Sequence, residues 1–338
     1  MFLVRAVLLL AAVLATVWAA AALHFDFPFA GAALAVLYAA LSVVLLWLAR
    51  RRVWATASWV LLFAAVTLWW FSLKATNDAD WQPNAARTAW AEIEGDRVIL
   101  HNVRNCEYRT EMDYTPRWET RAYDLARLQH ADLFLTHWGW PYIAHPIISF
   151  DFGGSDHVCF SVETRMRNGQ SYSAVEGFFR RFGLIYVVAD ERDVIRLRTN
   201  YRKDEEVRLY RLTLSPEAVR AFWTGYVRRV NQLHEQPAWY NAVTENCTTS
   251  VRRDVAATLG HPALHWNWRI LANGYLDEML YQDGYIVGNN LPFPELAERA
   301  NINQAAHAAN DSPDFSALIR AGRPGFRGYS FNANVMLR

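Results

Sequence analysis

The sequence predicts an α+β domain that follows three membrane-spanning helices. Hydrophobic residues make up 53% of the 338 residues, above the roughly 45–50% of a typical soluble domain, and the excess lies before Lys74. Beyond Lys74, strand patterns come first and helix patterns later, an order typical of α+β domains. We therefore expect a membrane region over residues 1–75 and one globular domain over residues 76–338.

Three apolar stretches form the membrane region: Leu3–Leu23, Ala30–Ala49 and Trp54–Leu73. Each approaches the ~20 residues that a spanning helix needs. The Arg50–Arg52 cluster separates the second stretch from the third, and the positive-inside rule places it in the cytoplasm. The N-terminus is then cytoplasmic, and we expect a multi-pass protein of the bacterial inner membrane whose C-terminal domain is periplasmic.

An alternative for the first stretch is a cleaved signal peptide, with Ala20-Ala21-Ala22 as the cleavage site. The arginine cluster fixes the orientation of the next two helices in either case.

Composition also limits which partners and cofactors we expect. The net charge of +1 provides no field that would recruit nucleic acid. The three cysteines imply no disulfide scaffold, and the sequence has no ligand spacing typical of a metal site. We therefore expect no nucleic-acid partner, no metal and no cofactor.

Local patterns predict several elements of the domain. Glu92–Arg104 alternates around Gly95-Asp96, which is a hairpin signal. Leu184–Ala189 and Val207–Leu214 read as strands. Ser215-Pro216-Glu217 predicts the start of a helix that continues to about Glu235. Beyond Gly274 we expect loops and short helices.

Cys247 is the candidate nucleophile. The sequence predicts a helix from Cys247 to Leu259 that Gly260 ends and that Asn246 or Thr244 can cap. Unpaired N–H groups and the positive end of the helix dipole would favour the thiolate, which is the reactive form. The same N–H groups would stabilise an oxyanion on an attacked carbonyl. The alternative is a small buried cysteine that packs the helix.

His145 is the candidate base, and Glu163 is the residue expected to orient it. Ile143–Phe152 and His157–Arg165 read as paired strands. A three-residue loop between them sets a register in which His145 lies opposite Glu163, at about 5 Å. The carboxylate would then hold one ring nitrogen and leave the other free as a base. A two-residue loop would put the pair on opposite faces.

Other interpretations of these residues stay open. His157 is a rival partner for His145, but it lies at the turn, about 20 Å along the strand from the pairing position. His145 could instead be a buried or edge-strand histidine, and the neighbouring Pro146 favours an edge strand. Glu163 could be a solvated strand carboxylate.

Several short stretches together carry a family resemblance. They are Asn77-Asp-x-Asp-Trp81, Val103-Arg-Asn105, Tyr108-Arg109, Ala144-His-Pro-x-x-Ser-Phe-x-Phe152, Ser161-Val-Glu163, Asp190-Glu-Arg-Asp193, Tyr240-Asn241, Asn246-Cys-Thr-Thr249, Phe315-Ser316 and Ile319-Arg320. In these stretches the chain resembles the Lnb N-terminal periplasmic domain family over roughly Asn77–Arg320.

The resemblance implies a papain-like domain in permuted order, with His before Cys, as in NlpC-type hydrolases and lecithin:retinol acyltransferase. It implies that Cys247 is the nucleophile and His145 the base, whereas Glu163 as third member follows from the register and from its place in a matched stretch. It also implies a thiol acyltransferase that moves an acyl chain from phospholipid to an amine, such as the N-terminus of a lipoprotein. The membrane helices precede the domain, which leaves the acceptor open.

Further residues are candidates for substrate binding. Arg104, Arg109 and Arg192 are possible phosphate contacts, because guanidinium groups bind phosphate in a forked geometry. Asn246 and Ser149 are the other candidates for substrate contact. The alternative for the arginines is structural pairing near Asp190 and Asp193.

Two other functions are compatible with the sequence. One is a periplasmic cysteine peptidase or amidase that uses the same dyad on cell-wall peptides or proteins. The other is a membrane-tethered binding module without thiol chemistry. Cys106 and Cys159 could form a disulfide in an oxidising periplasm or remain two buried thiols.

Overall fold

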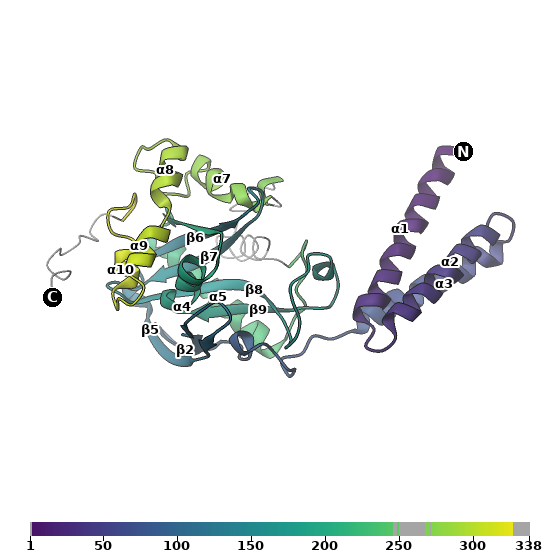
Figure 1. Cartoon of the computed structure of the whole chain (residues 1–338), viewed down its shortest axis with the longest axis horizontal. Coiled ribbons are helices and arrows are strands. Elements are labelled where there is room, and N and C mark those ends of the chain that lie inside the picture. The colour runs from purple at the N-terminus through teal and green to yellow at the C-terminus, as the bar shows by residue number, and fades with distance from the viewer. Residues whose placement is uncertain (1, 246–248, 250–267, 271, 327–338) are drawn as a thin grey trace.

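The chain forms three N-terminal helices and a separate domain that mixes strands and helices (Figure 1). The computed structural model describes residues 2–245, 249, 268–270 and 272–326. The α+β class and the three apolar N-terminal helices predicted from the sequence are confirmed.

The N-terminal helices are α1 (Phe2–Asp26), α2 (Gly31–Leu48) and α3 (Val53–Ser72). Each is long and apolar enough to cross a membrane. Many of their large apolar side chains are exposed, including those of Leu8 and Leu61. Apolar surface of this extent marks contact with lipid or another apolar partner.

The domain is built on an eight-stranded sheet in the order β1-β2-β9-β8-β7-β6-β10, with β5 paired to β2 off this path. β2 and β9 are parallel, and the other neighbours are antiparallel. The strands are β1 (Trp90–Glu94), β2 (Arg97–Arg104), β5 (Trp118–Asp124), β6 (His130–Trp138), β7 (Ala144–Asp151), β8 (His157–Arg165), β9 (Gly183–Ala189) and β10 (Glu205–Arg211). A second, two-stranded sheet contains β3 (Glu107–Tyr108) and β4 (Tyr114–Thr115).

Helices pack on both faces of the large sheet. α5 (Pro216–Glu235) buries Phe222, Trp223 and Tyr226 against one face. The opposite face is covered by α4 (Glu191–Arg196), α9 (Asn303–Ala308) and α10 (Phe315–Leu318). Other helical segments among the described residues are α7 (Leu276–Gln282), α8 (Phe293–Ala300), the π-helix Leu197–Tyr201 and short turns at Pro83–Ala85, Leu125–Arg127, Glu176–Phe178, Trp268–Ile270 and Asn273–Tyr275.

Several local predictions are confirmed. The β1–β2 hairpin turns at Gly95, whose φ of +63° favours glycine. α5 begins at Pro216, and the Ser215 hydroxyl accepts a hydrogen bond from the Ala218 N–H. The last predicted strand is shorter than expected and ends at Arg211, because Leu212 bridges to Ile286 outside the sheet.

The β7–β8 hairpin has the register that a three-residue loop requires. Ile147 lies opposite Ser161, and the turn between the strands is the expected loop Gly153–Ser155. The next pair on the same face is therefore His145 and Glu163. The edge-strand interpretation of His145 is wrong, because β7 lies between β6 and β8. Proline is tolerated next to His145 because the ladder with β8 begins only at Ile147.

A buried network of charges ties the end of the domain to the sheet. The Arg320 guanidinium bonds the carboxylates of Asp132 (2.9 Å) and Glu191 (2.6 Å). Arg211 bonds Asp132 at 2.6 Å and Asp151 at 3.3 Å. All five side chains are buried, so each charge depends on its partners for compensation.

Arg165 joins β8 to the chain that leaves the membrane helices. Its guanidinium donates to the Asn77 side chain at 2.7 Å and to the backbone carbonyls of Ala85 and Ala86. It also lies 4.4 Å from the centre of the Trp81 ring, a cation–π contact. The exit segment is thus fixed to the same strand that carries Glu163.

Cys106 and Cys159 are free and buried, which agrees with the second of the two alternatives. Burial raises the pKa of Cys106 to about 11 and raises the pKa of Cys159 well above its ordinary value. Both thiols are therefore protonated at neutral pH and poorly reactive.

Candidate functional site

His145, Ser161 and Glu163 lie on one face at the same end of β7 and β8. Alternation along β8 buries Phe160 and Val162 in the core that includes α5, so its odd-numbered residues point to the opposite face. β7 contributes His145 to that face in the observed register. The two strands therefore bring a histidine, a hydroxyl and a carboxylate together.

These three side chains form a chain of hydrogen bonds. His145 Nε2 lies 2.8 Å from Ser161 Oγ, and Ser161 Oγ donates to Glu163 Oε1 at 2.8 Å. The direct distance from His145 Nε2 to Glu163 Oε1 is 3.9 Å. The carboxylate thus reaches the imidazole mainly through the serine hydroxyl.

The serine hydroxyl fixes the tautomer of His145. A hydroxyl has one proton to donate, and that of Ser161 is directed to Glu163. Nε2 of His145 must then carry the proton in its bond to Ser161 Oγ. The Nδ1 lone pair is left free of a proton, which is the arrangement that a general base requires.

Arginines set the electrostatics of this site. Arg198 lies 3.5 Å from Glu163 and 3.3 Å from Glu205. Burial would raise the pKa of Glu163, but the arginines, led by Arg198, lower it to about 2. Burial, reinforced by Arg198, lowers the pKa of His145 to about 3. At neutral pH the site contains a carboxylate and a neutral imidazole.

These pKa shifts predict that acid destabilises the domain. In the folded chain the pKa values of His145 and Glu163 lie below their ordinary values of 6.5 and 4.5. At a pH between the folded and the ordinary pKa of each group, the unfolded chain therefore binds more protons than the folded chain. Their contribution is complete above pH 6.5 and is lost as the pH falls toward 3. We expect the thermal unfolding midpoint to drop between pH 7.5 and 4.5. His145→Gln should show a smaller drop, and an equal drop in both chains would contradict the assignment.

A pocket of about 510 Å³ opens beside His145. Its wall includes Glu163 and Glu205, the arginines at 104, 198 and 202, and the residues Ile143, Met166 and Tyr172. A wall with both cationic and apolar parts suits a substrate that combines an anionic group with a hydrocarbon chain.

Two residues that line this pocket lie before and after Cys247 in the chain. Ala242, five residues before Cys247, and Asn273 both line it. The Asn273 side chain also accepts from the Ala144 N–H at 2.8 Å and donates to the Ala144 carbonyl at 2.6 Å, next to His145. Cys247 itself and Asn246 lie outside the described residues.

Arg104 and Arg109 are paired in different settings. Arg104 lines the pocket, but it is buried and holds Asp193 through Nε and Nη2, at 2.7–3.1 Å. Arg109 is exposed and binds Asp113 on the β3–β4 turn. The structural pairing considered above, near Asp190 and Asp193, describes Arg104 and does not describe Arg109.

Ser149 and Arg192 do not line the pocket. Ser149 is buried on β7, four residues beyond His145, and donates to Glu191 at 2.5 Å. The Arg192 N–H donates to the Asp190 carboxylate, which caps α4. Both residues therefore support the buried charge network and the start of α4.

Sequence reasoning missed four residues of the site: Ser161, Arg198, Arg202 and Asn273. Ser161 could have been found, because it shares a strand face with Glu163 two residues away. The other three reach the pocket through tertiary contacts that no local pattern announces.

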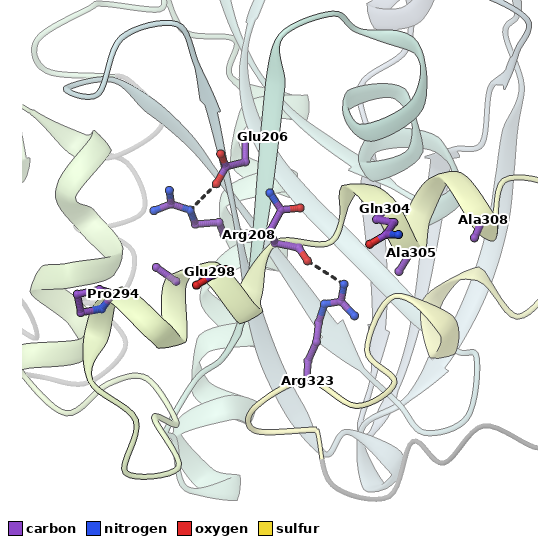
Figure 2. A pocket seen from close by; sticks show the side chains of 10 residues that line it. Glu206, Arg208, Pro294, Glu298, Gln304, Ala305, Ala308 and Arg323 are labelled. Carbon is purple, nitrogen blue, oxygen red and sulfur yellow. Dashed lines mark hydrogen bonds and ion pairs between the residues drawn. The ribbon is translucent and has the colours of Figure 1, made fainter.

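A second depression, of about 920 Å³, lies between β10, α8 and α9 and is lined by none of the predicted site residues. Figure 2 shows Glu206 accepting a hydrogen bond from Arg208. Arg323 donates to the Asn301 carbonyl. Because His145 and Glu163 line the other pocket, the pocket beside His145 is the better candidate.

Comparison with known proteins identifies one family. The model described as the Lnb N-terminal periplasmic domain matches residues 114–274, a span that contains His145, Glu163 and Cys247. No curated protein and no solved structure matches the chain. Residues 114–274 therefore match the family that the sequence resemblance indicated.

Proposed function

We propose that the chain is a thiol acyltransferase in which Cys247 is the nucleophile, His145 the base and Glu163 the orienting carboxylate. The observation that supports this most strongly is the pocket beside His145. There a neutral imidazole whose Nδ1 carries no proton lies beside a pocket that Ala242 and Asn273 also line, and these two residues precede and follow Cys247 in the chain. The proposal includes a papain-like arrangement in permuted order.

The proposed reaction has two half-reactions. His145 removes the proton of Cys247, and the thiolate attacks an ester carbonyl of a phospholipid. The tetrahedral oxyanion collapses, the lysophospholipid leaves with a proton from His145, and a thioester remains on Cys247. An amine, such as a lipoprotein N-terminus, then attacks the thioester, transfers a proton to His145 and leaves as an amide while the thiol is restored.

A nearby thiolate would also change the base. An opposite charge within about 4–6 Å favours the protonated imidazole, so it would raise the pKa of His145 from about 3. Proton transfer from Cys247 and ion-pair formation would then support each other, as thiol catalysis requires.

The proposal places the domain in the periplasm, held to the inner membrane by α1–α3. It is supported by the cytoplasmic preference of the Arg50–Arg52 cluster and by the periplasmic family of residues 114–274. Anchoring puts the pocket near lipid esters and replaces encounter by diffusion through bulk water.

A direct test is the formation of an acyl-enzyme. The full chain is incubated with phosphatidylethanolamine vesicles and digested, and the Cys247 peptide is examined by mass spectrometry for an acyl adduct that hydroxylamine removes. The peptides of Cys106 and Cys159 are internal controls, and Cys247→Ala is the matched variant. Absence of the adduct, together with cleavage of cell-wall peptides that requires Cys247, would favour the peptidase or amidase instead.

Glu163→Gln tests the orienting role of the carboxylate. A hydrogen bond to a charged group contributes about 1.5–3 kcal/mol, so we expect acylation to slow by about ten- to a hundredfold. Glu163→Asp should retain part of the rate because it keeps the charge. A Gln variant as fast as the native chain would show that Glu163 serves Arg198 and not His145.

A further inference from the structure

Two loops beside the pocket emerge at the same end of the sheet. The β6–β7 loop spans residues 139–143, and the β8–β9 loop spans residues 166–182. Because His145 lies opposite the end of β8, the start of β7 and the end of β8 are neighbours. Figure 1 shows this end of the sheet turned toward α1–α3.

The β8–β9 loop directly contacts the ends of the membrane helices. The Arg180 N–H donates to Asp26 at 3.1 Å, and the Arg181 guanidinium donates to the Phe25 carbonyl at 3.0 Å. The Phe25 and Phe179 rings lie 5.0 Å apart. These contacts hold this end of the domain at the height where α1 ends.

The two loops, together with Val243 and Trp268, expose large apolar and aromatic side chains. We define the aromatic rim as residues that are 47–69% exposed, namely Trp140, Tyr142, Ile143, Tyr172, Val175, Phe178, Val243 and Trp268. Trp and Tyr combine an apolar body with a polar tip, and they are enriched where a bilayer meets water. Clusters of this kind on a water-soluble surface mark a binding site for an apolar partner.

The rim and the pocket share residues. Ile143 and Tyr172 belong to the rim and also line the pocket beside His145. Whatever covers the rim therefore also faces the pocket opening.

We infer that the aromatic rim docks on the surface of the phospholipid bilayer that α1–α3 span, so that the pocket opens onto lipid. The occupant is a lipid surface because the rim is continuous with the contacts between the β8–β9 loop and the ends of α1 and α3, where the Arg180 guanidinium lies 4.3 Å from the centre of the Trp70 ring. This inference rests on the membrane anchoring of the proposed function and adds the route by which a phospholipid ester enters.

Photocrosslinking tests the inference. The full chain with Cys247→Ala is placed in nanodiscs of phosphatidylethanolamine and phosphatidylglycerol. The photoreactive residue p-benzoylphenylalanine replaces Trp140 or Phe178 in the rim, or Ser155 as a control. Ser155 is exposed at the β7–β8 turn, at the other end of β7, about 27 Å from the rim end. Irradiation should give phospholipid adducts at both rim positions and none above the dark sample at Ser155.

Each other outcome overturns the inference. Equal adducts at Ser155 would mean random contact with lipid, crosslinks to a second copy would make the rim a self-association surface, and no adduct would leave the rim in water. Thermal unfolding midpoints equal to that of the unlabelled Cys247→Ala chain show that the labelled chains are folded. The crosslinked chains lack the Cys247 thiol, so this experiment does not depend on acyl transfer. If the rim forms lipid adducts here but the native chain forms no acyl adduct on Cys247 in the earlier test, the proposed function is overturned and the docking inference stands.

Discussion

His145→Gln should slow acylation of Cys247 by about 10²–10⁴-fold, the usual contribution of a general base. Glutamine can still donate a hydrogen bond to Ser161, so the buried contact is largely kept. It has no basic nitrogen and cannot take the proton of the thiol. The measurement is the initial rate of acyl adduct formation, followed by mass spectrometry at neutral pH.

The matched control is His130→Gln. His130 is exposed at the other end of the sheet, at the start of β6, and it should leave the rate unchanged. If His145→Gln acylated as fast as the control, His145 would be a buried structural histidine, and the catalytic proposal would lose its base.

Arg320→Leu should lower the free energy of unfolding by about 3–5 kcal/mol, the cost of leaving buried charges unpaired. Asp132 and Glu191 are fully buried and both depend on this guanidinium. Burial alone would raise the pKa of Glu191, and Arg320 is the main group that lowers it, to about 2. For a domain of this size we expect the thermal midpoint to fall by roughly 6–20 °C.

Arg299→Leu is the control for Arg320. Arg299 forms an exposed pair with Glu295 one turn earlier on α8, and such pairs contribute little. Its midpoint should stay that of the native chain. Near-ultraviolet circular dichroism of the detergent-solubilised chain follows both transitions. Equal midpoints for the two variants would show that the buried network does not stabilise the domain.

The sequence was sufficient for the parts of the site that local rules determine. Turn length and side-chain alternation predicted the register that brings His145 to Glu163. Ser215 and Pro216 predicted the start of α5, since capping chemistry acts over a few residues.

Other features depend on contacts between distant segments. Arg198 reaches Glu163 from a π-helical segment after α4, and Asn273 reaches Ala144 across 129 residues. Pro146 favoured an edge strand by a local rule, but tertiary packing placed β7 inside the sheet. No periodicity in the sequence encodes such encounters.

The clamp that Arg165 forms on the exit segment has a kinetic consequence. Because Arg165 binds Asn77 and stacks on Trp81, the segment that follows α3 is tied to β8 only a few residues after the helix ends, which leaves a short connection between the helices and the domain. Under the proposed function, the pocket can then meet only lipid that lies close to α1–α3 of the same chain. We expect turnover to follow the mole fraction of donor lipid in that leaflet and to be insensitive to dilution of the vesicles in buffer.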